Sequence, residues 1–354
     1  MLGRNSACAL NNQSIKTMKK TYFITMITAA LMGSAYANTD YTATPGTHSS
    51  PPDNVYGTYA DTGEASGASV RVFEVETGGY AYIARVRGGL TYYGNAANNT
   101  VTMEGGEVRV MYGGYVAETG DAAGNTVTVT GGQVPRGICG GHVDGDGDAY
   151  ENKVTMSDCS AGTSVVGGRA NTGKATKNTV SITRSTASGT LYGGFSVSGD
   201  ATYNAVTMSD GQVGSNVYGG YVDDSGDVTG NTVGMTGGEV SGYVYGGDVD
   251  DSGDATGNAV DMTGGEVDGW VYGGSTGFGN ATGNTVDMTG GEVSGSVKGG
   301  YTYLGDATEN AVTINDGQVG DDVYGGYVGD SGDVTGNTVT MTGGEVGDEG
   351  YGGY

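Results

Sequence analysis

An asparagine returns every 26 or 27 residues over most of this chain of 354 residues, and this period constrains the fold more than any other feature. In almost every copy it lies in the phrase G-D-A-T-G-N-T-V-x-M-T-G-G-E-V-x-x-x-V-Y-G-G-Y. A repeat of this length is typical of solenoids, in which each unit buries its apolar side only against its neighbours. The recurring residues are Asn99, Asn125, Asn152, Asn178, Asn204, Asn231, Asn258, Asn284, Asn310 and Asn337.

The unit from residue 231 to 257 predicts three short strands and three turns. Val233 and Met235 alternate with small or polar residues, which is the two-residue period of a strand. We expect a corner at residues 237–238, a second turn at residues 246–247, and an acidic loop at residues 248–254. No window has the 3.6-residue apolar spacing of a helix. The sequence therefore predicts an all-β fold, a right-handed parallel β-solenoid (β-helix) of about ten turns.

Stacking of such turns converts sequence columns into physical columns. The valine two residues after each asparagine, from Val101 to Val339, is never replaced, and we expect it to form the spine of the core. The next inward column, from Met103 to Met341, holds Met, Ile or Val. Because asparagine tolerates a left-handed backbone and can hydrogen-bond to its own kind, we interpret its column as a structural ladder, not a catalytic or glycosylated site.

Composition supports order and restricts the partners. The 73 glycines fall in fixed columns, as expected for turns rather than for a flexible tract. The chain carries 40 acidic and 15 basic residues, a net charge of −25, and four of the basic residues precede residue 38. This acidic excess argues against nucleic acid or an anionic membrane surface as a partner.

Residues 18–37 have the pattern of a Sec signal peptide. Lys19 and Lys20 precede a short apolar run, and an A-x-A motif ends at Ala37. The run is too short to span a membrane, and we expect no transmembrane helix in the mature chain. The predicted organisation is an N-terminal extension plus signal peptide (1–37), a linker (38–66) and the solenoid (67–354).

Two aromatic columns lie after the second predicted strand, and they have two interpretations. One column contains Tyr218, Tyr245 and Tyr272, and the other, three residues further on, contains Tyr221 and Tyr301. Either the rings stack along the rod, or one column is exposed and binds sugar or protein.

The acidic loop also has two interpretations. An aspartate precedes the ladder asparagine by four residues in most turns, and Lys174 and Asn280 interrupt the column. Aspartate is a common turn residue, but stacked carboxylates would also gain from binding calcium weakly. The calcium hypothesis concerns Asp223, Asp224, Asp227, Asp250, Asp251 and Asp254.

Catalytic patterns are scarce. No Ser/His/Asp or Cys/His arrangement has a supportable spacing, so we predict no enzyme, no catalytic residue and no cofactor other than the calcium considered above. Cys139 and Cys159 lie 20 residues apart, and either a disulfide or two free thiols fits. The alternative function is a secreted β-helix enzyme acting on polysaccharide, with its site in residues 136–184, where Arg169 and Lys174 lie.

The repeat G-N-T-V-x-M-T-G-G-E-V-x-G-x-V-Y-G-G-Y behind a Sec signal resembles the passenger regions of bacterial autotransporter-type surface proteins. The resemblance covers about residues 70–354 and is one of repeat style. It implies an adhesin-like rod, secreted or on the surface of a Gram-negative cell, whose partners are a host-surface glycan or protein or other cell-surface molecules. Such proteins end in an outer-membrane barrel, so we expect this chain, which stops within a repeat, to be a fragment.

Overall fold

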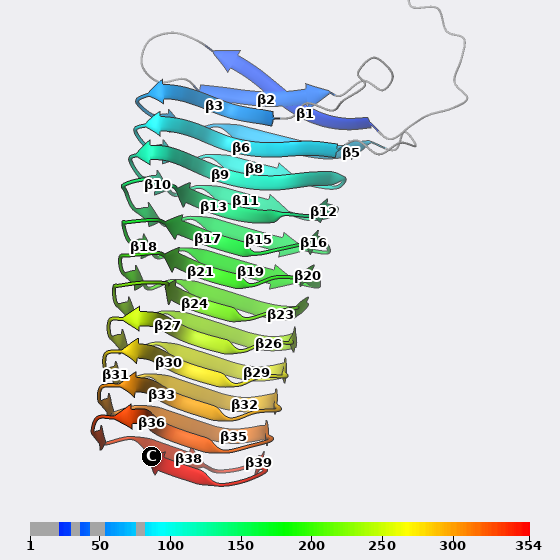
Figure 1. The fold of residues 1–354 in the computed structure, drawn as a ribbon. Coiled ribbons are helices and arrows are strands. Elements are labelled where there is room, and N and C mark those ends of the chain that lie inside the picture. Colours follow the sequence, from blue (N-terminus) through cyan, green and yellow to red (C-terminus); the bar gives the residue numbers. More distant parts are fainter. Residues whose placement is uncertain (1–20, 30–35, 43–53, 76–81) are drawn as a thin grey trace, which may run out of the picture.

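The computed structural model describes residues 21–29, 36–42, 54–75 and 82–354, and these form a parallel β-solenoid without a helix (Figure 1). Each turn has a first side, a corner, a second side and a short third side. The third sides form a sheet of eleven strands, so the described chain makes about eleven turns, one more than predicted. At ~4.8 Å between turns, the stack is about 50 Å long.

The first side carries the inward valine and methionine columns. Its strands are β5 (Ser69–Val75), β8 (Thr100–Met103), β11 (Thr126–Val129), β15 (Lys153–Ser157), β19 (Thr179–Thr183), β23 (Ala205–Val213), β26 (Thr232–Val240), β29 (Ala259–Val267), β32 (Thr285–Val293), β35 (Ala311–Val319) and β38 (Thr338–Met341). In several turns the strand continues round the corner, and in others a separate short strand follows it: β12 (Gln133–Val134), β16 (Ser160–Ala161), β20 (Ser185–Ala187) and β39 (Glu345–Val346).

The second side leads back along the opposite face of each turn. Its strands are β3 (Asn54–Thr62), β6 (Tyr82–Tyr93), β9 (Glu107–Thr119), β13 (Gly137–Val143), β17 (Val165–Ala170), β21 (Leu191–Ser196), β24 (Val217–Val222), β27 (Val244–Ser252), β30 (Val271–Phe278), β33 (Val297–Leu304), β36 (Val323–Ser331) and β40 (Gly350–Gly353).

The third side consists of two-residue strands that precede the ladder asparagine. They are β4 (Ala65–Ser66), β7 (Ala96–Ala97), β10 (Ala122–Ala123), β14 (Ala149–Tyr150), β18 (Ala175–Thr176), β22 (Ala201–Thr202), β25 (Val228–Thr229), β28 (Ala255–Thr256), β31 (Ala281–Thr282), β34 (Ala307–Thr308) and β37 (Val334–Thr335).

The predicted spine is confirmed. Val101 to Val312 of the valine column are almost fully buried, and Met235 and its equivalents pack beside them in one continuous core. Burying each of these side chains contributes roughly 1.5–3 kcal/mol. Met341, in the last turn, is exposed.

The asparagine ladder is also confirmed, and its geometry is the same in successive turns. The Asn231 side-chain amide donates to the Asn258 side-chain oxygen at 2.9 Å and to the Ala201 carbonyl at 2.8 Å. The Asn231 oxygen in turn accepts the backbone and side-chain N–H groups of Asn204. Each buried amide therefore joins three turns and satisfies backbone groups at the bend.

Two details of the predicted turns are wrong. The left-handed residue is the one before the ladder asparagine, such as Gly230 (φ 63°), and not the asparagine itself. The pair Gly246–Gly247 lies inside β27 and makes no turn. Glycine is needed there because a Cβ on Gly247 would collide with the Asn258 side chain. The corner predicted at residues 237–238 is confirmed by Gly238 (φ 95°).

The N-terminal boundary differs from the prediction. β3 pairs in parallel with β6 and β4 with β7, so residues 54–66 of the predicted linker belong to the solenoid. Within the predicted signal peptide, residues 18–20 and 30–35 lie outside the described residues, as do residues 1–17. Its remainder contributes β1 (Thr21–Ala29) and the start of β2 (Tyr36–Thr42), which pair antiparallel, and β1 also pairs with β5. Export stays a prediction.

Candidate binding surface on the second side

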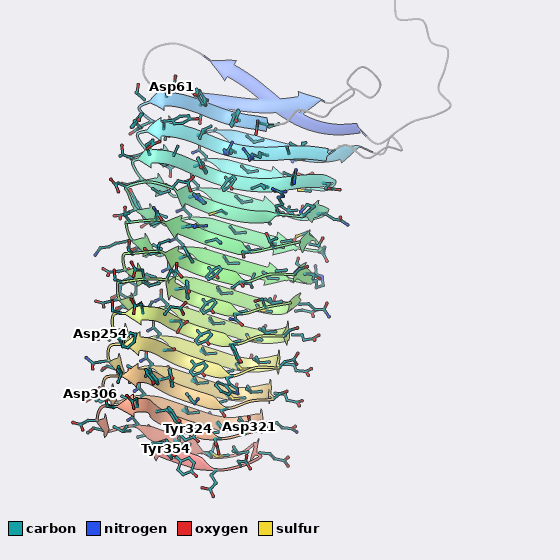
Figure 2. All side chains as sticks on the ribbon, in the orientation of Figure 1. Asp61, Asp254, Asp306, Asp321, Tyr324 and Tyr354 are labelled. Atoms are coloured by element: carbon teal, nitrogen blue, oxygen red, sulfur yellow. The ribbon has the colours of Figure 1, made fainter. Side chains whose placement is uncertain are left out.

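Outward side chains of the second side form what we call the aromatic face, which runs along the rod to Tyr324 and Tyr354 near its C-terminal end (Figure 2). It has two columns, because strands of this side pair in register from turn to turn. The first column is Tyr56, Arg87, Tyr112, Cys139, Val166, Tyr192, Tyr218, Tyr245, Tyr272, Lys298, Tyr324 and Tyr351. The second is Tyr59, Leu90, Tyr115, His142, Arg169, Phe195, Tyr221, Asp248, Ser275, Tyr301, Tyr327 and Tyr354.

The first column forms a stack of parallel rings over four turns. Ring centroids of Tyr192, Tyr218, Tyr245 and Tyr272 follow one another at 5.2, 4.9 and 4.8 Å, with interplanar angles of 5°, 7° and 3°. Since the ring faces contact each other, the stack presents mainly ring edges outward. Of the two interpretations, stacking along the rod therefore describes this column.

Lys298 interrupts the stack and is held by aromatic rings. Its Nζ lies 4.5 Å from the Trp270 ring centroid, 4.7 Å from that of Tyr327 and 5.2 Å from that of Tyr272. The Tyr301 and Tyr324 rings lie at 5.4 and 5.8 Å. The residue is only 6 % exposed. Burial lowers the pKa of Lys298 to about 8, while the electron-rich ring faces favour its charged form.

Two arginines occupy the columns in a similar way. The Arg87 guanidinium lies 4.7 Å from the Tyr115 ring centroid and 5.3 Å from that of Tyr112. Arg169 lies 4.8 Å from the Phe195 ring centroid. Cations that replace a ring in this face are thus packed against the rings that remain.

Asp248 and Ser275 leave a gap in the second aromatic column. Asp248 was predicted to lie in the acidic loop, but it belongs to β27 and is 6 % exposed. Burial raises the pKa of Asp248 to about 7, the Ser275 hydroxyl opposes this shift, and Asp250 adds to it. A carboxyl group in this position is therefore partly protonated near neutral pH.

His142 is paired with an acidic residue two positions further along. Its Nε2 lies 2.5 Å from the Asp144 carboxylate, and its ring stacks on Tyr115 at 5.2 Å between centroids. The hydrogen bond from His142 lowers the pKa of Asp144 to about 2. Neighbouring Cys139 is buried, and burial raises the pKa of its thiol to about 12. A thiol with so high a pKa is a poor nucleophile.

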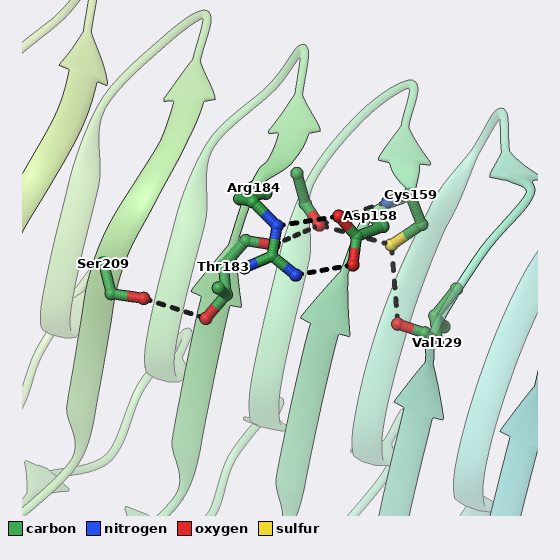
Figure 3. A network of polar contacts seen from close by, with 7 residues as sticks. Val129, Asp158, Cys159, Thr183, Arg184 and Ser209 are labelled. Carbon is green, nitrogen blue, oxygen red and sulfur yellow. Dashed lines mark hydrogen bonds and ion pairs between the residues drawn. The ribbon is translucent and has the colours of Figure 1, made fainter.

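Both cysteines in the described part of the chain are free, so the disulfide interpretation is wrong. Cys139 lies on the outer face, whereas Cys159 belongs to the core. The Cys159 thiol contacts the Val129 carbonyl and the Ser185 hydroxyl at 3.6 Å (Figure 3).

Four basic residues within residues 136–184, the region suggested for an enzyme site, make local contacts: Arg169, Lys174, Lys177 and Arg184. Arg184 makes a bidentate pair with Asp158 at 2.9 and 2.8 Å (Figure 3). Both have positive φ and stand at the corner where other turns have glycine. Lys174 pairs with Asp200 at 2.8 Å. The two residues proposed for the polysaccharide enzyme, Arg169 and Lys174, therefore lie in separate contacts.

Four of the six predicted calcium residues fall into two groups by their contacts. Asp227 and Asp254 each accept the backbone N–H of the next turn at 2.9 and 2.8 Å, so this column is a second side-chain ladder. Asp250 accepts the Tyr221 hydroxyl at 2.6 Å, and Asp223 accepts it at 3.2 Å. Asp224 and Asp251 belong to neither set of contacts. Among the described residues, no three His, Cys, Asp or Glu side chains converge on a metal position. Calcium binding stays a prediction.

A groove of about 730 Å³ follows the glycine corner over five turns. Its floor is formed by glycines such as Gly265 and Gly291, and Glu266, Glu292 and Glu345 lie along it. These acidic groups are one or two turns apart, because Gln318 lies between Glu292 and Glu345, and they do not converge.

Two exposed aromatic residues lie beside the first column. Tyr243 and Trp270 are each 39 % exposed, and they directly precede β27 and β30. Their equivalents in six other turns are polar: Ser164, Thr190, Asn216, Ser296, Asp322 and Glu349. The sequence columns did not indicate that Tyr243, Trp270, Lys298 and Asp248 belong together. The available signal was that each of these four residues, all between residues 243 and 304, differs from the usual residue type of its column.

Comparisons with known proteins identify no relative: no family model, no curated protein and no solved structure matches the chain. In the described part of the chain, no helix has the length and apolar character needed to cross a membrane.

Proposed function

We propose that this chain is the repeat region of an exported, non-enzymatic surface rod, of the kind found in autotransporter-type adhesins, secreted or held on the surface of a Gram-negative cell. One observation carries the proposal: a continuous stack of about eleven turns carries two outward columns rich in aromatic residues on its second side. A surface of this kind suits binding, because aromatic residues combine apolar area with hydroxyl groups. The signal-like segment and the net charge of −25 agree with a soluble extracellular rod.

The rival function is a polysaccharide-acting enzyme, and local contacts favour the rod. The rival needs free acid and base groups in one groove. Instead Lys174 and Arg184 pair with Asp200 and Asp158, and Arg169 packs on Phe195. Release of reducing sugar from acidic polysaccharides, lost on substitution of Lys174 or Arg169, would favour the enzyme and contradict the proposal.

A display experiment tests the rod. The full gene is expressed in a Gram-negative host, and the repeat region is detected by antibody on intact cells and by release with external protease. We expect surface exposure, and we expect beads coated with the full chain to adhere to target cells better than albumin-coated beads. Retention inside the cell, or no adhesion above albumin, would contradict the proposal.

A further inference from the structure

The pair Tyr243 and Trp270 is a local exception on a repetitive rod. Trp270 is the only tryptophan of the chain. Repeated side chains need only stacking to explain them, whereas exposed aromatic residues in two adjacent turns need another reason. Exposed apolar groups rimmed by polar residues commonly mark binding sites.

Packing fixes both rings in place. Their centroids are 5.7 Å apart, and the planes are inclined at 43°. Tyr243 lies against Gly269 and Trp270 against Gly295, each one turn further along, where a Cβ would collide with the ring. The ring centroid of Tyr245 lies 6.3 Å from that of Tyr243, and the centroid of Tyr272 lies 6.2 Å from that of Trp270. The two rings are therefore pre-organised and lose little freedom when they bind.

Lys298 covers one side of the indole. Its Nζ lies 4.5 Å from the Trp270 centroid and is buried, so the exposed surface of Trp270 belongs to the remainder of the ring. An ammonium on one face of an aromatic ring reduces the attraction of that ring for a second cation. The exposed surface thus suits a neutral, partly apolar group better than a cationic one.

The small exposed area of the two rings and the nearby negative charge restrict the class of ligand further. Two half-exposed rings offer far less than the ~800 Å² that each partner buries in a standard protein–protein interface. Two acidic residues lie near the pair in sequence or register: Asp268 comes two residues before Trp270, and Asp322 lies two turns further along its column. They repel anionic ligands and accept hydrogen bonds from hydroxyl groups. The ring spacing is close to the length of one sugar unit in an extended glycan.

We propose that Tyr243 and Trp270 form a platform that binds a neutral glycan chain, with the C–H faces of successive sugar units packed on the two rings. Hydroxyl groups at the sugar edges donate to acidic side chains such as Asp268. This inference rests on the proposed function as a surface rod, and it names the ligand class and the place on the rod where the ligand binds.

The sole tryptophan reports on binding directly. The full chain is titrated with neutral hexasaccharides of glucose, N-acetylglucosamine, mannose and xylose, with sialylated and sulfated glycans and with hexalysine, while tryptophan fluorescence is recorded. We expect a saturable change with at least one neutral glycan. In Gly295→Ala the new Cβ displaces the indole without removing it, and we expect affinity to fall at least about tenfold. Calorimetry should show a similar loss in Trp270→Ala.

Matched variants separate the platform from general effects. Gly234→Ala adds a Cβ on the first side with only one neighbouring atom, at 3.9 Å, and Phe278→Ala removes an exposed ring at the end of β30. Both should bind like the parent, and unchanged circular dichroism in all variants shows that the fold is retained.

Failure of this inference is distinguishable from failure of the rod proposal. A response confined to anionic glycans or hexalysine, no response to any neutral glycan, or undiminished affinity in Gly295→Ala and Trp270→Ala would overturn the platform. If a protein that fails these binding tests still reaches the cell surface and supports adhesion, the proposed function as a surface rod is retained and only the glycan assignment is wrong.

Discussion

At the scale of the residue, hydrogen bonds between identical side chains replace the backbone bonds that each bend loses. Asn231 is fully buried and makes two donor contacts, while its oxygen accepts two more from Asn204. Gly230, beside it, takes the left-handed backbone, and in other turns that position holds Glu151, Lys177, Tyr203 or Glu309 with φ near 55°. At each bend, hydrogen bonding thus determines the asparagine, whereas a left-handed backbone conformation is what the preceding position requires.

Asn231→Ala should lower the free energy of unfolding by about 3 kcal/mol, because leaving buried donors and acceptors unpaired costs ~1–3 kcal/mol each. The midpoint of urea unfolding measures this. Asn171→Ala, outside the ladder, is the control and should shift the midpoint little. An equal shift in both variants would contradict the structural role of the column.

Glu309→Gly should raise stability by about 0.5–1 kcal/mol. The left-handed conformation costs a non-glycine residue ~1–2 kcal/mol, and the entropy of glycine in the unfolded chain offsets part of the gain. The reverse change, Gly283→Ala, should lower stability by a similar amount, since φ is 63° there and no atom lies within 4 Å of the new Cβ. Thermal unfolding of both variants checks the pair, and same-direction shifts would refute the backbone explanation.

At the scale of the element, the second-side strands determine what the rod can bind. Their inward residues belong to the core, and their outward columns place rings from successive turns about one strand spacing apart. Where a cation replaces the ring, it is packed against the neighbouring rings, as Lys298 is. Asp248 is the substitute that interacts least favourably with its surroundings, because a carboxylate there is buried beside tyrosines.

Stability should depend on the charge of Asp248. Its pKa is about 7 when folded against 3.8 when exposed, so the folded state binds more protons between pH 4 and 7. The stabilisation is complete below pH 4 and is lost as the pH rises towards 7. Asp248→Asn should therefore raise the unfolding midpoint at pH 7.5, and the variant should gain less than the parent on acidification from pH 7.5 to 5. Parallel pH profiles for the two proteins would contradict this.

One ring stack of the first column ends at Tyr272, and Tyr324 and Tyr351 form another, with their centroids 5.2 Å apart. Lys298→Tyr should connect these two stacks. We expect it to fold with unchanged or higher stability, whereas Lys298→Ala should lose about 2–3 kcal/mol through its cavity and lost ring contacts. Chemical denaturation compares the two, and a less stable tyrosine variant than alanine variant would contradict the stacking geometry.

Sequence columns were sufficient to predict the fold class, the Val101–Val339 spine and the asparagine ladder, because these depend on period and side-chain type. They could not locate Gly247 inside a strand, since the need for glycine comes from contact with Asn258 of the same turn. The candidate site was missed for a similar reason. The ring contacts of Lys298 and the packing of Trp270 on Gly295 depend on contacts between turns, whereas the sequence columns indicate only that a residue type differs.

At the scale of the whole molecule, the rod carries a large negative charge on a regular framework. The Asp227 column bonds to backbone N–H groups, and Asn280 does the same without charge, accepting from Asp306 at 3.0 Å. Charge and hydrogen bonding can therefore be separated experimentally in this column.

Replacing Asp227 and Asp254 by Asn should keep both hydrogen bonds and remove repulsion. We expect a higher melting temperature in metal-free, low-salt buffer, and a smaller rise than the parent on adding salt or calcium. Alanine at both positions should lower the melting temperature instead. If chelator and low salt leave the parent unchanged, neither repulsion nor calcium matters in this column.

The central claim is that each repeat adds one turn to a continuous stack, and a distance measurement tests it most directly. Thr102, Thr155 and Thr340 occupy one outward column, with Thr102 nine turns and Thr155 seven turns from Thr340. Spin labels on cysteines at 102 and 340, in a chain lacking its native cysteines, should give a narrow distance near ~43 Å, and labels at 155 and 340 near ~34 Å. Broad distributions, or distances that do not shorten by about two strand spacings between the pairs, would contradict the solenoid.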